Sequence, residues 1–131
     1  NLFFELNKHL AKLMNQFPAY NVTMKEVHHI HKLDAPSGTA LTLVDGIISN
    51  LDRKDKWTLG TTATLNEIAI EALREGEVAG IHTVRYESDA DSIEITHSAK
   101  NREGFALGSV IAAEFVCGKK GFLTMNDLLK F

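Results

Sequence analysis

Residues 26–40 of the sequence, EVHHIHKLDAPSGTA, place three histidines and a lysine just before a Pro-Ser-Gly-Thr turn. The histidines are His28, His29 and His31, and the lysine is Lys32. Imidazole changes its charge near neutral pH, so a histidine here could give or take a proton at a reacting centre. The neighbouring lysine adds positive charge. These residue types favour a site that binds a small anion and transfers protons to it.

The Pro-Ser-Gly-Thr turn predicts the start of a helix. Pro36 disfavours helical backbone at the residue before it, and Ser37 is a favoured N-cap residue. Gly38 and Thr39 would then be the first helical residues, and their N–H groups would lack partners within the helix. Free N–H groups at the positive end of a helix dipole bind anions, and the Thr39 hydroxyl adds a donor. We therefore expect a carboxylate or phosphate to bind here.

Two other interpretations of the same residues are open. A zinc ion takes about four ligands in a tetrahedral arrangement, and His29 and His31 could supply two of them. However, no Cys or His follows at a compact ligand spacing, and Lys32 would place a positive charge beside the ion, so we expect no metal site. Alternatively, Ser37 only caps a helix while the histidines lie on a solvent-exposed strand.

Apolar spacing along the chain predicts the elements that must position this segment. Apolar residues at three- and four-residue intervals indicate helices, and alternation indicates strands. The expected elements are a helix over 2–17, a strand over 22–31, a helix over 40–51, a hairpin with strands 81–87 and 92–98, and a buried helix over 103–117. Polar residues 49–66 predict a solvent-exposed loop, whereas the pattern of 67–76 leaves strand and helix open.

Alternation within the first predicted strand separates its side chains into two faces. It places Val22, Met24 and Glu26 on one side of the strand. If extended backbone continues to residue 32, His28 and Lys32 share one face and the other two histidines point to the opposite face. The cluster would then not form one tight group.

Composition and charge narrow the class of protein. With 131 residues, 44% hydrophobic and 24% charged, the chain fits one soluble domain with a buried core. Its net charge of −3 and its scattered basic residues argue against a nucleic-acid partner. No apolar run reaches the ~20 residues of a membrane span, and no export signal opens the sequence, so we expect no membrane contact.

Two further details bear on where the chain works and whether it works alone. The single cysteine, Cys117, lies in an apolar run and is expected to be a buried thiol. A lone buried thiol suits a reducing compartment, so we expect the cytoplasm. The sequence begins with Asn1 rather than an initiator Met, which favours a piece of a longer chain.

The run HHIHKLDAPSGTA at 28–40 resembles the signature of the dihydrodipicolinate reductase (4-hydroxy-tetrahydrodipicolinate reductase) family, which serves the diaminopimelate route to lysine. The similarity continues in the NLFF opening, in IEITHSA at 93–99, in the ALG helix and in the ending GFLTMNDLL. Together these stretches resemble the C-terminal domain of the family, which binds substrate and forms the tetramer.

The resemblance assigns roles to the residues of the anion site. It implies that His28 is the catalytic proton donor or acceptor and that Lys32 is a second proton donor, while a nicotinamide delivers hydride to the substrate ring. It implies that His29 contacts the substrate and that Gly38 and Thr39 hold a substrate carboxylate, which agrees with the free N–H groups expected above. The implied reaction reduces a cyclic dicarboxylate with NADH or NADPH to tetrahydrodipicolinate.

The resemblance also implies an α+β fold, in which helices cover a four-stranded mixed sheet and residues 68–75 form one strand. Residues 1–131 would be a substrate-binding and oligomerisation domain that assembles as a homotetramer. The family's nucleotide-binding half begins with a GxGxxG loop, which this sequence lacks. We therefore expect NADH or NADPH to bind in a missing N-terminal domain and the chain alone to be inactive. The alternative is a stand-alone anion-binding or assembly module without redox activity.

Four residues outside the segment also receive predictions. Arg102, at a helix start, could approach the cofactor or the substrate, but a solvated arginine is the favoured interpretation. His82 and His97 lie on the hairpin strands, and we expect structural roles for both. His9 is expected to face solvent from the polar side of the first helix.

Overall fold

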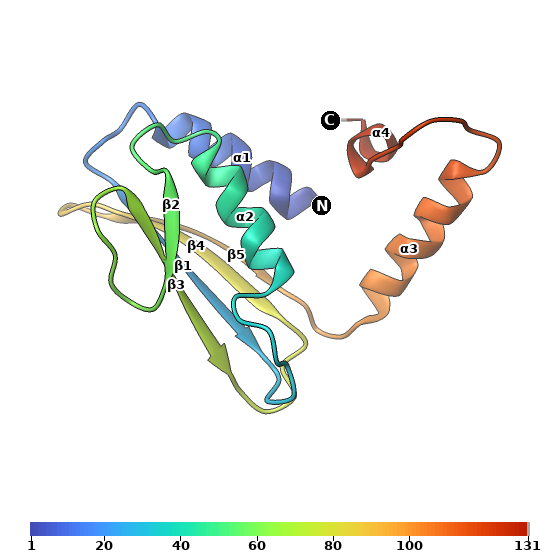
Figure 1. The fold of residues 1–131 in the computed structure, drawn as a ribbon, viewed down its shortest axis with the longest axis horizontal. Coiled ribbons are helices and arrows are strands. Elements are labelled where there is room, and N and C mark those ends of the chain that lie inside the picture. The colour runs from blue at the N-terminus through green and yellow to red at the C-terminus, as the bar shows by residue number, and fades with distance from the viewer. Residues whose placement is uncertain (131) are drawn as a thin grey trace.

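Two helices cover one face of a five-stranded sheet, as Figure 1 shows. The computed structural model describes residues 1–130. The covering helices are α1 (Leu2–Met14) and α2 (Gly38–Ile48), and the strands are β1 (Asn21–His28), β2 (Lys56–Leu59), β3 (Glu67–Arg74), β4 (Ile81–Glu87) and β5 (Ser92–Ser98). After β5 the chain forms α3 (Glu103–Val116) and α4 (Met125–Leu129), which stand to one side of the sheet and its helices.

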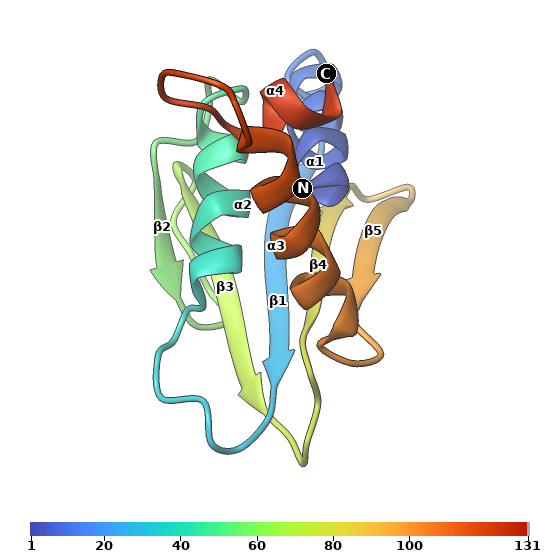
Figure 2. The ribbon, with the colours of Figure 1, turned by 90° about the vertical axis from the view of Figure 1, so that its right-hand side faces the viewer.

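The sheet is mixed, and β1 lies at its centre in the order β2-β3-β1-β4-β5. β1 pairs with β3 in parallel and with β4 in antiparallel orientation, while β2 is parallel to β3 and β5 is antiparallel to β4. Figure 2 shows the strands side by side, with β2 and β5 at the two edges. Because parallel strands need a crossover connection, α2 carries the chain from β1 back to the start of β2 and β3.

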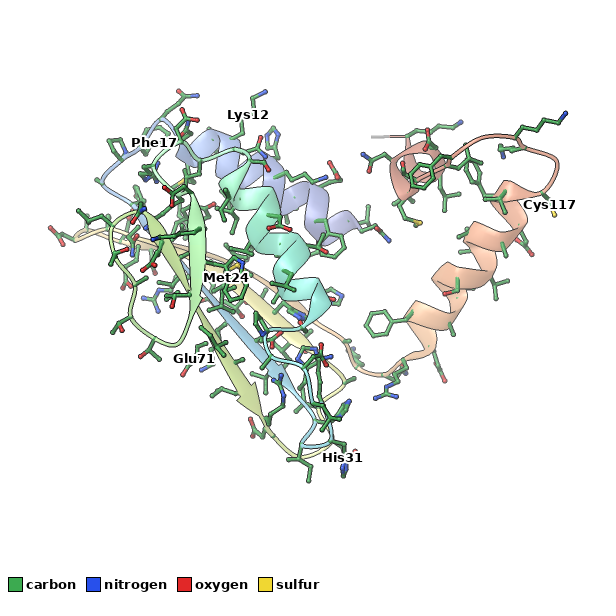
Figure 3. All side chains as sticks on the ribbon, in the orientation of Figure 1. Lys12, Phe17, Met24, His31, Glu71 and Cys117 are labelled. Atoms are coloured by element: carbon green, nitrogen blue, oxygen red, sulfur yellow. The ribbon has the colours of Figure 1, made fainter. Side chains whose placement is uncertain are left out.

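The core lies between the sheet and the layer formed by α1 and α2. The alternation predicted for β1 is confirmed, since Val22, Met24 and Glu26 are all buried on the helix side. Lys25 points to the opposite face, where its ammonium lies 3.4 Å from the Glu71 carboxylate. Figure 3 shows Met24 on the side of the helices and Glu71 on the outer face. The apolar core is completed by Ala11, Met14, Ala40, Leu43, Val44, Ile47, Leu51, Ile68, Ile70, Val84 and Tyr86.

The predicted α+β class is confirmed, and the ambiguous segment 67–76 forms the strand β3. The two hairpin strands match their predicted bounds. α2 begins at Gly38, as the Pro-Ser-Gly-Thr turn predicts. Other ends differ: α1 stops at Met14 rather than residue 17, α2 stops at Ile48 rather than residue 51, and β1 stops at His28 rather than residue 31. Chain reversals, rather than the apolar pattern, set these ends.

The sheet has five strands rather than the expected four, because residues 56–59 of the predicted loop form β2. This edge strand is mostly exposed, so its sequence carries no burial pattern, and backbone pairing with β3 alone defines it. The neighbouring Lys54 anchors the region. Its buried ammonium donates to Asn21 Oδ1 at 2.7 Å and to the carbonyls of Leu65 at 2.9 Å and Glu67 at 2.8 Å.

The prediction of a buried helix over 103–117 is wrong in one respect. A helix forms, but no residue of α3 is buried within the part of the chain that the structure describes. Phe105, Leu107 and Val110 are each more than half exposed. Cys117, predicted to be buried, is exposed just beyond this helix, and Figure 3 shows it at the end remote from the sheet. Apolar composition predicts burial only where a partner surface is present.

No helix within residues 1–130 is long and apolar enough to cross a membrane.

Candidate functional site

The predicted site residues gather where β1 ends and α2 begins. His28 is the last residue of β1, and a loop over 29–37 leads to the N-terminus of α2. The sheet register brings two further strands to this place. Glu26 on β1 lies opposite His82 on β4, and His28 lies opposite Arg74 on β3. Three neighbouring strands and one helix therefore supply side chains to a single site.

Glu26 is a carboxylate in the interior of this site, with only 1% of its surface exposed. The Ser37 backbone N–H donates to both carboxylate oxygens at 3.1 Å, and the Ser37 hydroxyl donates to Oε2. His82 Nε2 lies 3.5 Å from Oε2. Burial would raise the pKa of Glu26, but hydrogen bonds from His82 and Ser37, together with the nearby His28, lower it to about 2. Glu26 is therefore an anion at neutral pH.

Ser37 joins this carboxylate to the start of α2. Its Oγ accepts a hydrogen bond of 3.2 Å from the N–H of Ala40, so the predicted N-cap is confirmed. The Ser37 hydroxyl proton goes to Glu26, so His82 Nε2, 3.1 Å from Oγ, must act as the donor in that contact. Capping is thus only part of what Ser37 does.

Gly38 and Thr39 occupy the first positions of α2 and are exposed. The N–H groups of Ala40 and Leu41 bond back to Ser37, whereas those of Gly38 and Thr39 find no partner in the described chain. No atom of residues 1–130 lies within 4 Å of the place where a Cβ on Gly38 would be. The helix therefore presents two free donors beside open space, which is the arrangement that binds an anion.

His28 packs against Glu26 and is 7% exposed. Its Nδ1 lies 3.7 Å from Glu26 Oε2 and finds no hydrogen-bond partner among the described residues. Its ring meets the His82 ring edge-on, with centroids 5.0 Å apart. A Cβ on Gly80, whose φ of 153° favours glycine, would come within 3.2 Å of His28 Nε2. Burial lowers the pKa of His28, although the Glu26 carboxylate acts in the opposite direction.

Lys32 follows β1 in a turn rather than on the strand. The N–H of Lys32 bonds to the carbonyl of His29, and the N–H of Ile30 bonds to Gly76 on the turn between β3 and β4. The expectation that His28 and Lys32 share one strand face is therefore wrong. In this turn Lys32 is still close enough to act on His28. Burial and the charge of His82 lower the pKa of His28, and the positive charge of Lys32 lowers it further.

Arg74 fixes the loop that carries Lys32. Its guanidinium donates to the carbonyl of Lys32 at 3.2 Å and to that of Asp34 at 2.5 Å. Its Nη2 also lies 3.5 Å from Glu26 Oε1. The Lys32 ammonium pairs with Asp34 Oδ1 at 2.8 Å. One arginine thus connects the buried carboxylate to the loop that bears the predicted proton donor.

His29 and His31 lie on the outer part of the same loop, with ring centroids 5.9 Å apart. Figure 3 shows His31 at the tip of the molecule, where its Nε2 lies 2.9 Å from Glu77 Oε1. His29 Nε2 accepts a hydrogen bond of 3.0 Å from Arg102, the residue before α3. Arg102 is exposed, as the favoured prediction had it, but it also contacts a predicted substrate-binding residue. His9 faces solvent as predicted.

A cleft of about 690 Å³ lies between the start of α1, the end of β5 and α3. Thr39 lines it, together with Phe3, His97 and Phe105. Of the predicted site residues that the structure describes, Thr39 alone belongs to this lining. The free end of α2 therefore lies beside both the His28 cluster and this cleft.

Glu26, His28 and His82 each place one nitrogen or oxygen atom within 4.8 Å of the other two, a spacing that a metal ion could bridge. However, the oxygen nearest both histidines, Glu26 Oε2, already accepts the hydrogen bonds from Ser37. We interpret the cluster as a hydrogen-bonded network. That the chain holds no metal stays a prediction.

The glycines of the described chain do not form a cradle for a nucleotide. Gly76 lies in the turn after β3, Gly80 packs against His28, and Gly104 and Gly108 lie inside α3. A dinucleotide pyrophosphate needs a glycine-rich turn that leads from a strand into a helix. None of these four glycines lies in such a turn, and that the nicotinamide nucleotide binds outside this chain stays a prediction.

Sequence reasoning missed four residues of this site: Glu26, Arg74, Gly80 and His82. For Glu26 a signal was present, because alternation placed a charged residue on the same strand face as two core residues. His82 was assigned a structural role only, and Arg74 and Gly80 were not singled out. These three reach the site through pairing of β1 with β3 and β4, which no local pattern displays.

Comparisons with known proteins identify relatives of the chain. The family model described as "Dihydrodipicolinate reductase, C-terminus" matches residues 1–129. The 4-hydroxy-tetrahydrodipicolinate reductase of Christiangramia forsetii is 51% identical over 129 residues, which cover 98% of this chain and 54% of that protein. The enzyme of the same name from Ralstonia pickettii is 40% identical, with coverage of 98% and 51%.

A solved structure is also similar. The dipicolinate-bound dihydrodipicolinate reductase of Paenisporosarcina sp. TG-14 superimposes with a TM-score of 0.63 at 25% identity, covering 85% of this chain and 44% of that one. The chain thus spans about half the length of the curated relatives it matches. By its match to the family model and its identity to these relatives, the chain belongs to the dihydrodipicolinate reductase family, with the match lying in the C-terminal domain.

Proposed function

We propose that residues 1–131 are the substrate-binding and oligomerisation domain of a two-domain 4-hydroxy-tetrahydrodipicolinate reductase. The complete enzyme reduces a cyclic dicarboxylate to tetrahydrodipicolinate in the diaminopimelate route to lysine, in the cytoplasm. The family membership and the relatives' names support this activity. The Paenisporosarcina relative is a dipicolinate complex by its title, and a planar dicarboxylate of that class is the ligand we propose here.

One observation carries the proposal at the level of the site. The buried carboxylate of Glu26 accepts the Ser37 N–H at the start of α2 and lies 3.7 Å from His28 Nδ1. A titratable ring and an anion-binding helix end are thereby held in one fixed arrangement. Such a pair can bind a carboxylate and pass a proton to the same molecule.

The residues of the site divide the work between binding and proton transfer. Gly38 and Thr39 hold one substrate carboxylate with their N–H groups and the Thr39 hydroxyl, and His29 contacts the substrate from the loop. His28 and Lys32 transfer protons to the ring. Because burial favours neutral His28, the negative charge of the bound substrate is needed to stabilise its protonated form.

The reductant is NADH or NADPH, which supplies a hydride and is bound by a part of the parent protein outside this chain. The lack of a glycine cradle in residues 1–130 supports this division. The chain alone is then a binding domain without reductase activity. A stand-alone module would show the same dicarboxylate binding, but no parent protein would catalyse the reduction.

The outer face of the sheet supports assembly into a homotetramer. Lys25, Glu71, Thr83 and Arg85 line a shallow hollow of about 290 Å³ on this face, opposite the helix layer. Within the described chain, no helix covers it (Figure 1). An uncovered sheet face of this kind can stack against that of a second copy.

Titration calorimetry of the chain with pyridine-2,6-dicarboxylate tests the site. We expect weak binding, because the pocket has one open wall and its charge pairs remain screened by water. A Thr39→Val, Lys32→Met double variant should bind at least about tenfold more weakly, since each lost charge-assisted contact contributes about 1.5–3 kcal/mol. Equal binding by the double variant would show that the anion site is misplaced.

The reaction itself is tested in the complete parent protein. We expect the parent to oxidise NADPH or NADH when the cyclic dicarboxylate is present and the 131-residue chain to oxidise neither. Oxidation of NADPH by the chain alone would contradict the two-domain interpretation. A parent that binds the dicarboxylate but reduces nothing would leave only the anion-binding module.

A further inference from the structure

Glu26 occupies a position where a carboxylate is costly. It is 1% exposed on the core side of the central strand, two residues before His28. A buried charge is tolerated only where hydrogen bonds and opposite charges compensate the loss of water. Here Ser37 supplies three hydrogen bonds, and His82 and Arg74 approach to 3.5 Å. Four groups, from the start of α2, from β3 and from β4, are thus committed to one anion.

We propose that Glu26 is a positioning residue for the reaction, a fixed buried anion that orients the His28 ring and favours its proton-carrying form. This inference rests on the proposed function, because it concerns the proton that His28 transfers to the substrate. Glu26 itself is buried beneath His28 and Ser37 and acts only through them.

Two contacts, one at each ring nitrogen, bear on the orientation of the His28 ring. Nδ1 is buried and has no hydrogen-bond partner among residues 1–130, and the anion in contact with it is Glu26 Oε2 at 3.7 Å. A displacement of less than about 1 Å would bring this pair to hydrogen-bond distance. A proton on Nδ1 would then be held toward Glu26, and Nε2 would exchange protons with the substrate. Gly80 keeps space beside Nε2, since a Cβ there would approach to 3.2 Å.

The charges around His28 come from every element packed against it. Glu26 on β1 is negative, whereas Lys32 on the loop and Arg74 on β3 are positive, and His82 faces it from β4. Burial, His82, Lys32 and Arg74 all lower the pKa of His28, and Glu26 alone raises it. Because the pKa of Glu26 is about 2, its charge persists through the working range of the histidine. Removing this charge removes the only opposing contribution.

The test compares Glu26→Gln with the unchanged protein. Glutamine keeps the size of the side chain and an oxygen that accepts from Ser37, but it loses the charge. Glu5→Gln is the matched control, because Glu5 lies on α1 and its carboxylate pairs with the neighbouring Lys8. Glu26→Asp keeps the charge on a shorter side chain and serves as the rescue variant. Circular dichroism establishes that each variant is folded.

The first readout is the titration of the His28 ring by NMR in the chain. We expect Glu26→Gln to lower the pKa of His28 by about one unit, because an opposite charge at this distance shifts a pKa by about 1–3 units. Glu26→Asp should recover most of this shift, and Glu5→Gln should leave the value unchanged. An unchanged His28 titration in folded Glu26→Gln would overturn the inference, whatever the enzyme assay shows.

The second readout is the pH profile of kcat in the complete reductase. Proton donation by His28 makes kcat fall as pH rises through its pKa, so a lower pKa moves this fall to lower pH. In Glu26→Gln the pH at which kcat falls should therefore be about one unit lower than in the unchanged enzyme. At pH values above this fall, kcat should be about tenfold lower. KM should change little. A carboxylate that only supports the fold would lower stability and leave the pH of this fall unchanged.

The two readouts separate the inference from the proposed function. If the parent reduces the dicarboxylate and the pH at which kcat falls is unchanged in Glu26→Gln, the inference fails and the proposed function stands. If the parent reduces no cyclic dicarboxylate, the proposed function fails first and Glu26 has no reaction to assist. If Glu26→Gln does not fold, the comparison passes to Glu26→Met, which has a side chain of similar size and also lacks the charge; an unchanged His28 titration in folded Glu26→Met would count against the inference.

Discussion

His28 and Lys32 are held in different ways, although we propose that both transfer protons. His28 is enclosed by Glu26, His82 and Gly80 at the end of a central strand. The Lys32 ammonium lies on a loop and pairs with Asp34, whose side chain is 60% exposed, at 2.8 Å. A surface ion pair contributes at most about 1 kcal/mol, so Lys32 can leave Asp34 for a bound dianion. We therefore expect His28 to be held in place before the substrate binds and Lys32 to move into contact with the bound substrate.

Removing either proton donor should affect turnover more than binding. In the complete reductase, His28→Gln or Lys32→Met should lower kcat by about 10²- to 10⁴-fold, because a proton delivered at the reacting centre matters mainly in the transition state. Steady-state kinetics measure kcat and KM separately. His9→Gln and Lys12→Met make the same changes on exposed positions of α1 and should have no effect. Near-normal turnover in both site variants would contradict the assignment.

Gly38 allows binding to be separated from folding. A Cβ there meets no atom of the described chain within 4 Å, so Gly38→Ala should fold normally and gain at most about 1 kcal/mol from helix propensity. The added methyl group would occupy the space beside the free N–H groups. Dicarboxylate affinity, measured by calorimetry, should fall about tenfold or more. Ser49→Ala, an equally small change at the exposed far end of α2, is the control. Unchanged affinity in Gly38→Ala would place the carboxylate elsewhere.

At the scale of elements, polar contacts hold segments in place that bury little apolar surface. The loop before β3 buries little apolar surface, yet Lys54 is 4% exposed and binds β1 through Asn21 and the approach to β3 through Leu65 and Glu67. Burial lowers the pKa of Lys54, which shows that its charge is partly shielded from water. This ammonium ties the segment just before β2 to β1 and to the start of β3.

Loss of Lys54 should therefore destabilise the fold. Lys54→Met leaves three acceptors without their donor, and each buried unsatisfied group costs about 1–3 kcal/mol, so we expect a loss of at least about 2 kcal/mol in the free energy of unfolding. Chemical denaturation of the chain measures this loss. Lys56→Met, two residues away, removes a 58% exposed side chain 3.5 Å from Glu67 and should cost less than about 1 kcal/mol. Equal effects of the two variants would argue against the anchoring role.

At the scale of the whole molecule, two surfaces lack cover within residues 1–130. One is the outer face of the sheet, and the other is α3, where Phe105, Leu107 and Val110 are 55–60% exposed. Contiguous apolar surface on a helix is typical of an interaction site. Because the chain spans about half the length of its relatives, both surfaces are expected to be covered in the assembled protein.

We expect the chain to form a tetramer through the outer sheet face. Multi-angle light scattering at micromolar concentration should report a mass near four times 14.5 kDa. Thr83→Glu, at the centre of this face, should lower the mass, because an unpaired charge is costly in a buried interface. Lys12→Glu on α1 should not. A folded monomer in the unchanged chain would refute assembly through this domain.

Local patterns in the sequence were sufficient for much of the architecture and for the free helix end that we propose as the carboxylate-binding part of the site. Alternation on β1 and on β4 reports which face is buried, and the Pro-Ser-Gly-Thr turn marks the start of α2 with Gly38 and Thr39 at its free end. These features depend on residues within a few positions of one another. The roles of His28 and Lys32 were suggested by the resemblance of 28–40 to a known family, and the structure does not test them.

The tertiary structure alone decided which charges surround His28. Glu26 and His82 are 56 positions apart in sequence, yet the antiparallel register of β1 and β4 sets them opposite each other. The parallel register of β1 and β3 likewise brings Arg74 to His28 and to the loop of Lys32. The exposed strand β2 and the uncovered helix α3 were also beyond prediction from the sequence. Each of these features depends on whether segments distant along the chain are in contact: β2 pairs with β3, whereas no segment within residues 1–130 buries α3. Periodicity within one segment carries no information about such contacts.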